Sequence, residues 1–315
     1  MGLYPKAITE YLSVLAVPRG PDSKIYLVDT EQGDDDSSGD RWTKPLKTLT
    51  AAYAKCVADQ HDVVLFLARD TADNPTATIA WDKDFTHLIG LGNALQGVGQ
   101  RCRVVGTVAN ALTSVIDFGG KGNIVRNMQF GNEASANVDS EAVNLTGDRY
   151  EFTNCMIHGM VHATPAARAG SYSLGLTGAH ENVFVGCWIG TDTIVRAAAN
   201  GELMMCAGSS KNLFQHCRFA SQSITAAKHM VAFVTSTTPM GLNTWEDCLF
   251  YNNSTNWAQD LTNAFVVTGA QATYYIDLCR CRLVGITGWS NVVTHVYSSD
   301  PASNAGFGVY VNPTT

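Results

Sequence analysis

The chain has 315 residues, of which 45% are hydrophobic and 16% charged, and its net charge is −7. It has no run rich in lysine and arginine, so we expect no nucleic-acid partner, and no apolar run approaches the roughly 18 residues of a membrane span. Residues 1–17 lack the basic start, continuous apolar core and cleavage site of a secretory signal. We therefore expect no membrane association, synthesis in a reducing cytoplasm and no cofactor.

Residues 1–30 are predicted to form an N-terminal arm. A short helix is expected over Lys6–Ala16, ended by Pro18, Gly20 and Pro21. The arm carries apolar side chains that we expect to act as an anchor, with Val14 and Val17 beside them: Leu3, Tyr4, Ile8, Tyr11, Leu12 and Leu15. Since they precede the repeating part of the chain, we expect another chain or subunit to bury them.

Residues 31–62 are predicted to form an acidic loop and a helix. The loop contains Asp34, Asp35, Asp36 and Asp40, which are oxygen ligands of the kind that calcium prefers. It lacks the alternating spacing and distal glutamate of an EF-hand, so we favour a solvated loop and predict no metal site. An alanine-rich helix is expected over Thr50–Asp59, with a strand after it over Val63–Leu67.

The rest of the chain, residues 63–315, contains a repeat. Five cysteines recur with gaps of 32, 30, 31 and 33 residues, and Met128 takes the same place in a sixth copy: Cys155, Cys187, Cys217, Cys248 and Cys281. Large apolar residues stand three before and two after each cysteine, as Phe152 and Ile157 do around Cys155. A fixed period of this length indicates a repeat architecture in which each unit buries its apolar face against its neighbours.

The repeating unit is predicted to consist of short strands. Its apolar residues alternate, and its breaks are Gly, Asn, Ser and Thr. A second run precedes each cysteine frame by about ten residues: 141–146, 173–177, 203–207, 230–235, 264–268 and 292–297. Asparagines five residues before the cysteine position suit a tight turn: Asn123, Asn182, Asn212 and Asn243. We therefore predict an all-β fold, a right-handed parallel β-helix with about 31 residues per turn.

The five cysteines are expected to form an inward column of small core residues. Their number in the whole chain is odd at 9, Met128 replaces one of them, and no CxxC or HxxxH pair accompanies them. These features argue against disulfides and against a zinc site.

Two outward columns contain the candidate functional residues. The position before the cysteine contains His216, Asp247 and Arg280, which are weak candidates for a catalytic or sugar-binding strip, with a salt-bridge ladder as the favoured interpretation. The position after the cysteine mixes apolar and basic residues in the manner of a protein interface: Met156, Trp188, Arg218, Leu249 and Arg282. Loops folded over this second column remain an equal alternative. Neither the column containing Asp247 nor the position before it contains two carboxylates, which hydrolysis of a glycosidic bond requires.

One segment resembles a known superfamily. The run G-D-x-x-x-x-P-x-K-T-L-x-x-A over 39–52, followed by Asp62–Leu65 and Leu88–Gly92, is similar to the beginning of pectate-lyase-like right-handed β-helix proteins. The resemblance extends over about residues 39–300. It implies that the helix caps the open N-terminal end of the coil, where an uncovered edge would otherwise be exposed.

The chain also resembles bacteriophage virion proteins built on β-helices. This resemblance implies a non-enzymatic capsid decoration or head-fibre protein, located in the virion, that forms a homotrimer and binds other virion proteins such as the major capsid protein. The alternative is a tailspike-like protein that binds or cleaves a host surface glycan, as a polysaccharide lyase or a glycoside hydrolase.

Overall fold

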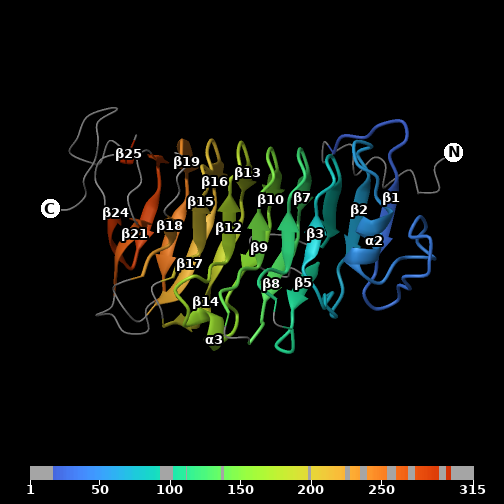
Figure 1. The fold of residues 1–315 in the computed structure, drawn as a ribbon, viewed down its shortest axis with the longest axis horizontal. Helices are drawn as coiled ribbons and strands as arrows, with labels where there is room; N and C mark the ends of the chain where they lie inside the picture. Colours follow the sequence, from blue (N-terminus) through green and yellow to red (C-terminus); the bar gives the residue numbers. More distant parts are fainter. Residues whose placement is uncertain are drawn as a thin grey trace.

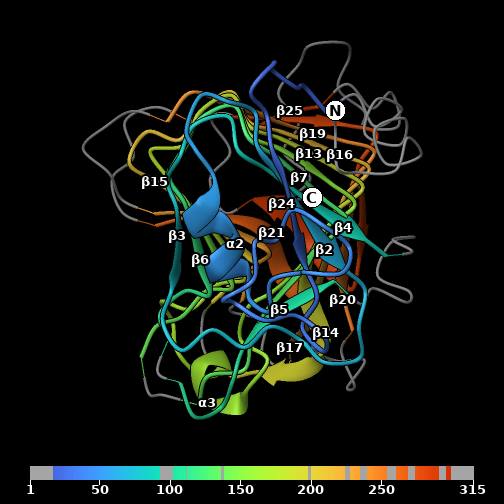
Figure 2. The same cartoon turned by 90° about the vertical axis from the view of Figure 1, so that its right-hand side faces the viewer.

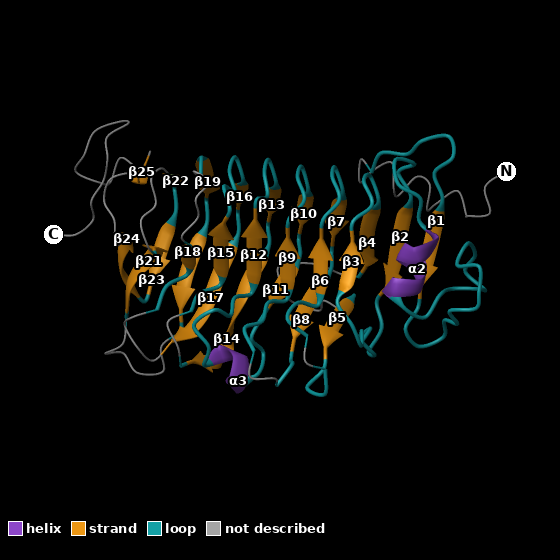
Figure 3. Ribbon diagram, in the orientation of Figure 1, coloured by secondary structure: helices purple, strands orange, loops and turns teal. Residues whose placement is uncertain are grey.

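The protein is an elongated coil of parallel strands (Figure 1). The computed structural model describes residues 17–92, 102–110, 112–135, 138–197, 200–223, 228–234, 240–253, 260–268, 274–290 and 296–298. The expected helix at Lys6–Ala16 and the six anchor residues from Leu3 to Leu15 lie outside the described residues. Strands dominate, and the helices α2 (Leu49–Lys55) and α3 (Ala163–Ala166) are short (Figure 3).

Three parallel sheets run the length of the coil. The ten-stranded sheet, here called sheet A, contains β1 (Ile25–Val28), β2 (Val63–Leu67), β4 (His87–Leu91), β7 (Ile124–Arg126), β10 (Glu151–Thr153), β13 (Val183–Val185), β16 (Leu213–Gln215), β19 (Leu242–Glu246), β22 (Tyr275–Cys279) and β25 (Val296–Ser298). The seven-stranded sheet B contains β5 (Arg103–Gly106), β8 (Gln129–Asn132), β11 (Met156–His158), β14 (Trp188–Arg196), β17 (Arg218–Ser223), β20 (Leu249–Asn252) and β23 (Arg282–Val284). The eight-stranded sheet C contains β3 (Ile79–Trp81), β6 (Ile116–Phe118), β9 (Val143–Leu145), β12 (Leu174–Thr177), β15 (Leu203–Cys206), β18 (Val231–Phe233), β21 (Leu261–Val267) and β24 (Ile286–Ser290). The predicted fold class, an all-β parallel solenoid, is confirmed.

The repeat positions stack as the period predicts. Phe152 pairs with Phe184, Phe184 with Phe214 and Phe214 with Trp245, and the first two ring pairs stack with centroids 4.8 and 4.7 Å apart. The five repeat cysteines are buried and form no disulfide. Each thiol donates to a carbonyl of the preceding turn, as Cys217 does to Phe184 O at 3.3 Å. All five side chains belong to the buried hydrophobic core, so the column is a packing element.

The repeat asparagines form a buried ladder in addition to filling a turn. Asn212 accepts from the backbone N of Asn182 at 3.1 Å and from its Nδ2 at 3.0 Å. Asn212 in turn donates from both its backbone N and its Nδ2 to Asn243 Oδ1. Each side chain therefore satisfies the polar groups of the turn beneath it, which backbone ladders alone leave unpaired at a corner.

Helix α2 lies over the N-terminal end of the coil (Figure 2). Leu49, Ala52 and Tyr53 join the hydrophobic core, and the Tyr53 ring stacks on Trp81 with centroids 4.3 Å apart. This agrees with the expected capping role. The helix ends at Lys55, earlier than the expected Asp59, because Cys56 adopts an extended conformation.

Both ends of the repeat differ from the predictions. Ile25–Val28, assigned to the arm, form β1 and pair with β2, because all four residues are apolar and are buried on both faces of the sheet. Val17, grouped with the anchor, is 6% exposed and packs on the coil of its own chain. At the other end, the run at 292–297 contributes β25 to sheet A, while β24 takes its place in sheet C.

Candidate functional site

The corner between sheets A and B positions the candidate residues. The residue before each cysteine adopts a left-handed backbone conformation, with φ between 51° and 62°: Asn154, Gly186, His216, Asp247 and Arg280. One residue in this conformation turns the chain sharply, so a strand of sheet A can end directly before it and a strand of sheet B can begin two residues later. Asparagine and glycine tolerate it well, whereas the last three residues are bulkier.

His216, Asp247 and Arg280 do stack, as the repeat predicts. Arg280 donates to Asp247 through two nitrogens, Nε to Oδ1 and Nη2 to Oδ2, both at 2.7 Å. His216 Nδ1 lies 3.7 Å from Asp247 Oδ2. Hydrogen bonds from Arg280 lower the pKa of Asp247, so this carboxylate is ionised at neutral pH.

A second carboxylate joins this ladder. Arg280 Nη2 also contacts Glu246 Oε1 at 2.6 Å, and Gln215 Nε2 donates to the other oxygen of Glu246 at 2.9 Å. The sequence analysis looked for two carboxylates within one column, and it missed this pair of carboxylates because Glu246 and Asp247 occupy adjacent columns. Asp277 lies on the same outer face of sheet A, where burial raises its pKa and the charge of Glu246 adds to the effect.

The column after the cysteine is in register across sheet B. Met156 pairs with Trp188, Trp188 with Arg218, Arg218 with Leu249 and Leu249 with Arg282. The Arg218 guanidinium lies over the Trp188 ring, 4.9 Å from its centroid. This contact fixes the orientation of both side chains.

Met156 does not fit the expected exposed column. It is 7% exposed, and its cross-strand neighbours Gln129 and Trp188 are both large enough to shield it. Trp188 and Leu249 are partly exposed, and Arg218 and Arg282 are exposed. The outward surface of this column therefore begins at Trp188.

The two columns meet in one groove. A hollow of about 220 Å³ is lined by Gly186, Cys187, Trp188, His216, Cys217, Arg218, Asp247, Leu249 and Arg282. The sequence analysis treated its two sets of residues as separate sites, and it did not single out Gly186. A Cβ atom at Gly186 would meet nothing within 4 Å, so the missing side chain leaves this end of the groove open. The sequence signal for this opening was Gly186, the glycine between Asn154 and His216 in the column that precedes the cysteines.

The groove has a positive, partly aromatic lining. Asp247 is paired with Arg280, whereas Arg218 and Arg282 form no ion pair with any described residue. The indole N–H of Trp188 is buried and forms no hydrogen bond with the described residues, so it is not available to a partner in the groove. This arrangement suits binding of an anionic or amphipathic partner.

The arrangement is less suited to hydrolysis. A general acid needs a raised pKa, but the acid closest to the groove, Asp247, is held ionised by Arg280. Within the described ranges, no three His, Cys, Asp or Glu side chains are grouped as metal ligands would be. In that same part of the chain, no helix is long and apolar enough to cross a membrane.

Comparisons with known proteins support the fold. No family model matches the chain, and no curated protein matches it. Among solved structures, the deglycosylated pectin methylesterase from Aspergillus niger is 13% identical with a TM-score of 0.56, and the match covers 95% of each chain. Pectate lyase Pel9A is 15% identical with a TM-score of 0.50, over 95% of this chain and 74% of the other.

A viral protein has the same fold. ORF18 of Geobacillus virus E2 is 12% identical with a TM-score of 0.53, and the match covers 94% of this chain and 59% of that protein. At these identities the likeness concerns the fold. The resemblance to pectate-lyase-like β-helix proteins, including a phage protein, is thus confirmed.

Proposed function

We propose that the protein is a non-enzymatic structural component of a bacteriophage virion, a capsid decoration or head-fibre protein that assembles as a homotrimer and binds the major capsid protein. The observation that carries this proposal is the groove: Trp188 and Leu249 lie between arginines, and the nearby carboxylates are already paired. Exposed aromatic, leucine and arginine side chains are the composition of a protein interface. The fold shared with ORF18 of Geobacillus virus E2 supports a virion location.

In a trimer, one repeated contact can cover this groove on every subunit. The groove follows the register of sheet B, so three parallel coils related by a threefold axis can each present the same strip to a neighbour. Trp188 supplies the large, partly exposed side chain that dominates such interfaces.

The first prediction tests this interface with Trp188→Asp. It should weaken the trimer by roughly 30-fold or more, because loss of an interface tryptophan typically costs at least about 2 kcal/mol. Sedimentation velocity measures the trimer, and circular dichroism should show unchanged β content. The matched control is Leu242→Asp, since Leu242 is 47% exposed on the outer face of sheet A. A wild-type protein that is monomeric at micromolar concentration contradicts the proposal, as does equal weakening by the control.

Virion attachment needs its own measurement. Purified protein should bind to phage particles made without it, at a fixed copy number per particle. Binding that requires a host glycan on the particle surface contradicts attachment to the major capsid protein.

A polysaccharide-active spike is the second candidate. The observation in its favour is that Asp247 and Asp277, near the same corner, have pKa values shifted in opposite directions. Such a separation is typical of an acid and a base in catalysis. Purified protein should be incubated with capsular polysaccharide and lipopolysaccharide, and new reducing ends and unsaturated products measured. Cleavage that is lost in both Asp247→Asn and Asp277→Asn would establish this candidate and overturn the non-enzymatic one.

A further inference from the structure

The outer face of sheet A changes along the coil. In the first strands its outward residues are at most 3% exposed, although they point away from the core: Ile25 and Leu27 of β1, Val63 and Leu65 of β2, and Ile89 of β4. The residues in the same two columns of β10, β13 and β16 are all partly exposed: Glu151, Thr153, Val183, Val185, Leu213 and Gln215. The first strands therefore differ from the later ones in both composition and burial.

These outward residues form a second hydrophobic cluster, distinct from the core. The cluster contains Val17, Ile25, Leu27, Val63, Leu65, Ile89 and Ile124, with Leu91 packed against it. Outward residues of a sheet lose contact with water only when another layer covers them. Val17 is the only member of the cluster that lies outside the strands of sheet A in the described ranges. Val17, the first described residue, therefore lies on this face.

We propose that residues 1–16 of the same chain cover the outer face of β1, β2 and β4. Ile8, Tyr11, Leu12 and Leu15 recur at the three- and four-residue spacing of one helix face. The expected helix over Lys6–Ala16 would span about 17 Å, and three strands span roughly 10 Å, so the segment is long enough to cross the face. Because Val17 already lies on the cluster, the connection within one chain is direct.

The segment then acts as a strap on the N-terminal turns of its own coil. This inference is independent of the proposed virion role, and it replaces the expectation that another chain buries the arm. The strap covers apolar surface next to the capped end of the coil, where β1 is the last strand of sheet A among the described residues.

A crosslinking experiment tests the position of the strap. A photo-crosslinking amino acid is placed at Leu12, and an equal mixture of light and heavy isotope-labelled chains is irradiated and digested. Crosslinks from residue 12 to peptides containing β1, β2 or β4 of the same isotope label support the proposal. Crosslinks only between light and heavy chains overturn it in favour of a second copy. Crosslinks to other parts of the coil overturn it as well.

A second experiment measures the covered surface. Deletion of residues 1–16, or the pair Leu12→Asp and Leu15→Asp, should lower the melting temperature by roughly 5 °C and raise the fluorescence of a hydrophobic dye several-fold. Ser13→Asp, between the two leucines, is the matched control and should change neither. If the deletion leaves both readings unchanged, another layer, such as residues 93–101 or a second copy, covers the face and the proposal is wrong. The crosslinking result stands even if the deleted chain fails to fold.

Discussion

At the scale of single residues, the corner before each cysteine shows what the repeat predicts and what it leaves out. The period placed His216, Asp247 and Arg280 in one column, and their contacts confirm the stacking. The left-handed conformation of this corner was not predicted, because no short pattern distinguishes it when the residue is His, Asp or Arg. This left-handed turn nevertheless places the column before the cysteines beside Trp188, so that the two outward columns line a single groove. A bulky residue held there costs of the order of 1 kcal/mol in backbone strain.

The asparagine ladder gives the second prediction, the substitution Asn212→Ala. Asn212 is 1% exposed, and its loss would leave the backbone N of Asn182 without an acceptor in a buried corner and remove one of two partners from Asn182 Nδ2. An unsatisfied buried group costs about 1–3 kcal/mol, so the free energy of unfolding should fall by about that amount. Urea denaturation measures the change. Asn74→Ala is the control, because Asn74 is exposed and bonds only to the local Ala72 O. Equal effects of the two substitutions contradict a structural role for the ladder.

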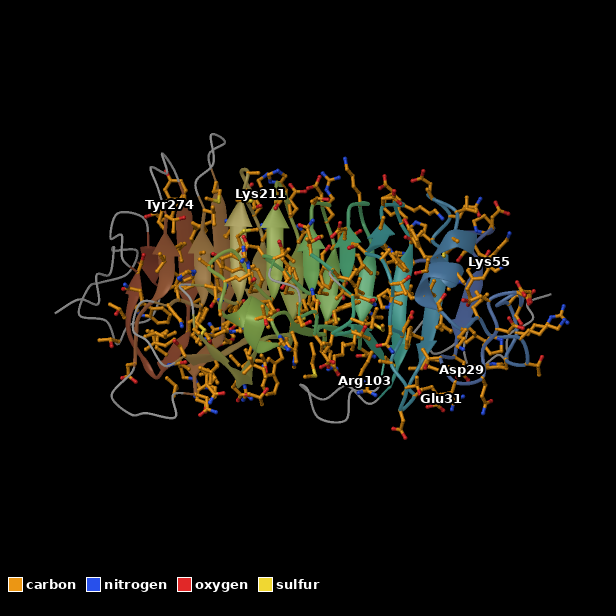
Figure 4. The ribbon with its side chains drawn as sticks, turned by 60° about the horizontal axis from the view of Figure 1, so that its bottom comes forward. Asp29, Glu31, Lys55, Arg103, Lys211 and Tyr274 are labelled. Atoms are coloured by element: carbon orange, nitrogen blue, oxygen red, sulfur yellow. The ribbon has the colours of Figure 1, made fainter. Side chains whose placement is uncertain are left out.

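At the scale of elements, the acidic loop and helix α2 form one unit. Asp35 Oδ1 accepts from the backbone N of Lys47 at 2.8 Å and of Thr48 at 2.9 Å, and Thr48 Oγ1 caps the helix at Ala51 N. Asp29 and Glu31 lie beside each other at the N-terminal end of the coil, and farther along it Lys211 lies on the edge opposite Arg103 (Figure 4). The sequence predicted a helix and an acidic loop separately. Their coupling depends on contacts between residues 12 or more apart, which local patterns do not report.

The third prediction concerns this unit. Asp35→Ala should destabilise α2 by about 1 kcal/mol, because it removes acceptors for two backbone N–H groups and the capping hydroxyl. Hydrogen exchange of residues 49–55 should become faster, and the melting temperature should fall slightly. Asp36→Ala is the neighbouring control, since the Asp36 side chain is exposed and only its backbone N donates, to Asp34. Unchanged exchange in Asp35→Ala would show that the loop does not support the helix.

At the scale of the whole molecule, the repeat made most of the coil predictable. Each turn adds a strand to each sheet, and the alternation of inward and outward residues follows from the cysteine frame. The ends were not predictable in the same way, because a repeat has no copy beyond them. The sequence therefore did not predict that Ile25–Val28 would join sheet A, or that Val296–Ser298, which overlap the run at 292–297, would form β25 in the same sheet.

The last prediction concerns the stability of the coil in acid. His87 is fully buried, its Nδ1 accepts from Ile124 N at 3.1 Å, and burial lowers its pKa to about 3. His229, in a distant turn, is 3% exposed, lacks a hydrogen-bond partner on either ring nitrogen within the described residues, and burial lowers its pKa to about 4. Because the folded-state pKa lies below the unfolded value of about 6.5, the unfolded chain binds these protons first. The contribution of these two rings to stability is therefore complete above about pH 6.5, and it is lost as the pH falls toward 4 for His229 and toward 3 for His87.

Urea denaturation at pH 7.5 and 4.5 separates this effect from the titration of carboxylates. His229→Phe removes one of the buried titrating rings, so between these pH values it should lose about 2–3 kcal/mol less stability than the wild type. The value at pH 7.5 serves as the reference for each protein, because a packing defect shifts both points equally. If the two proteins lose the same stability on acidification, His229 does not hold a neutral ring in the folded coil, and protonation elsewhere must drive acid unfolding.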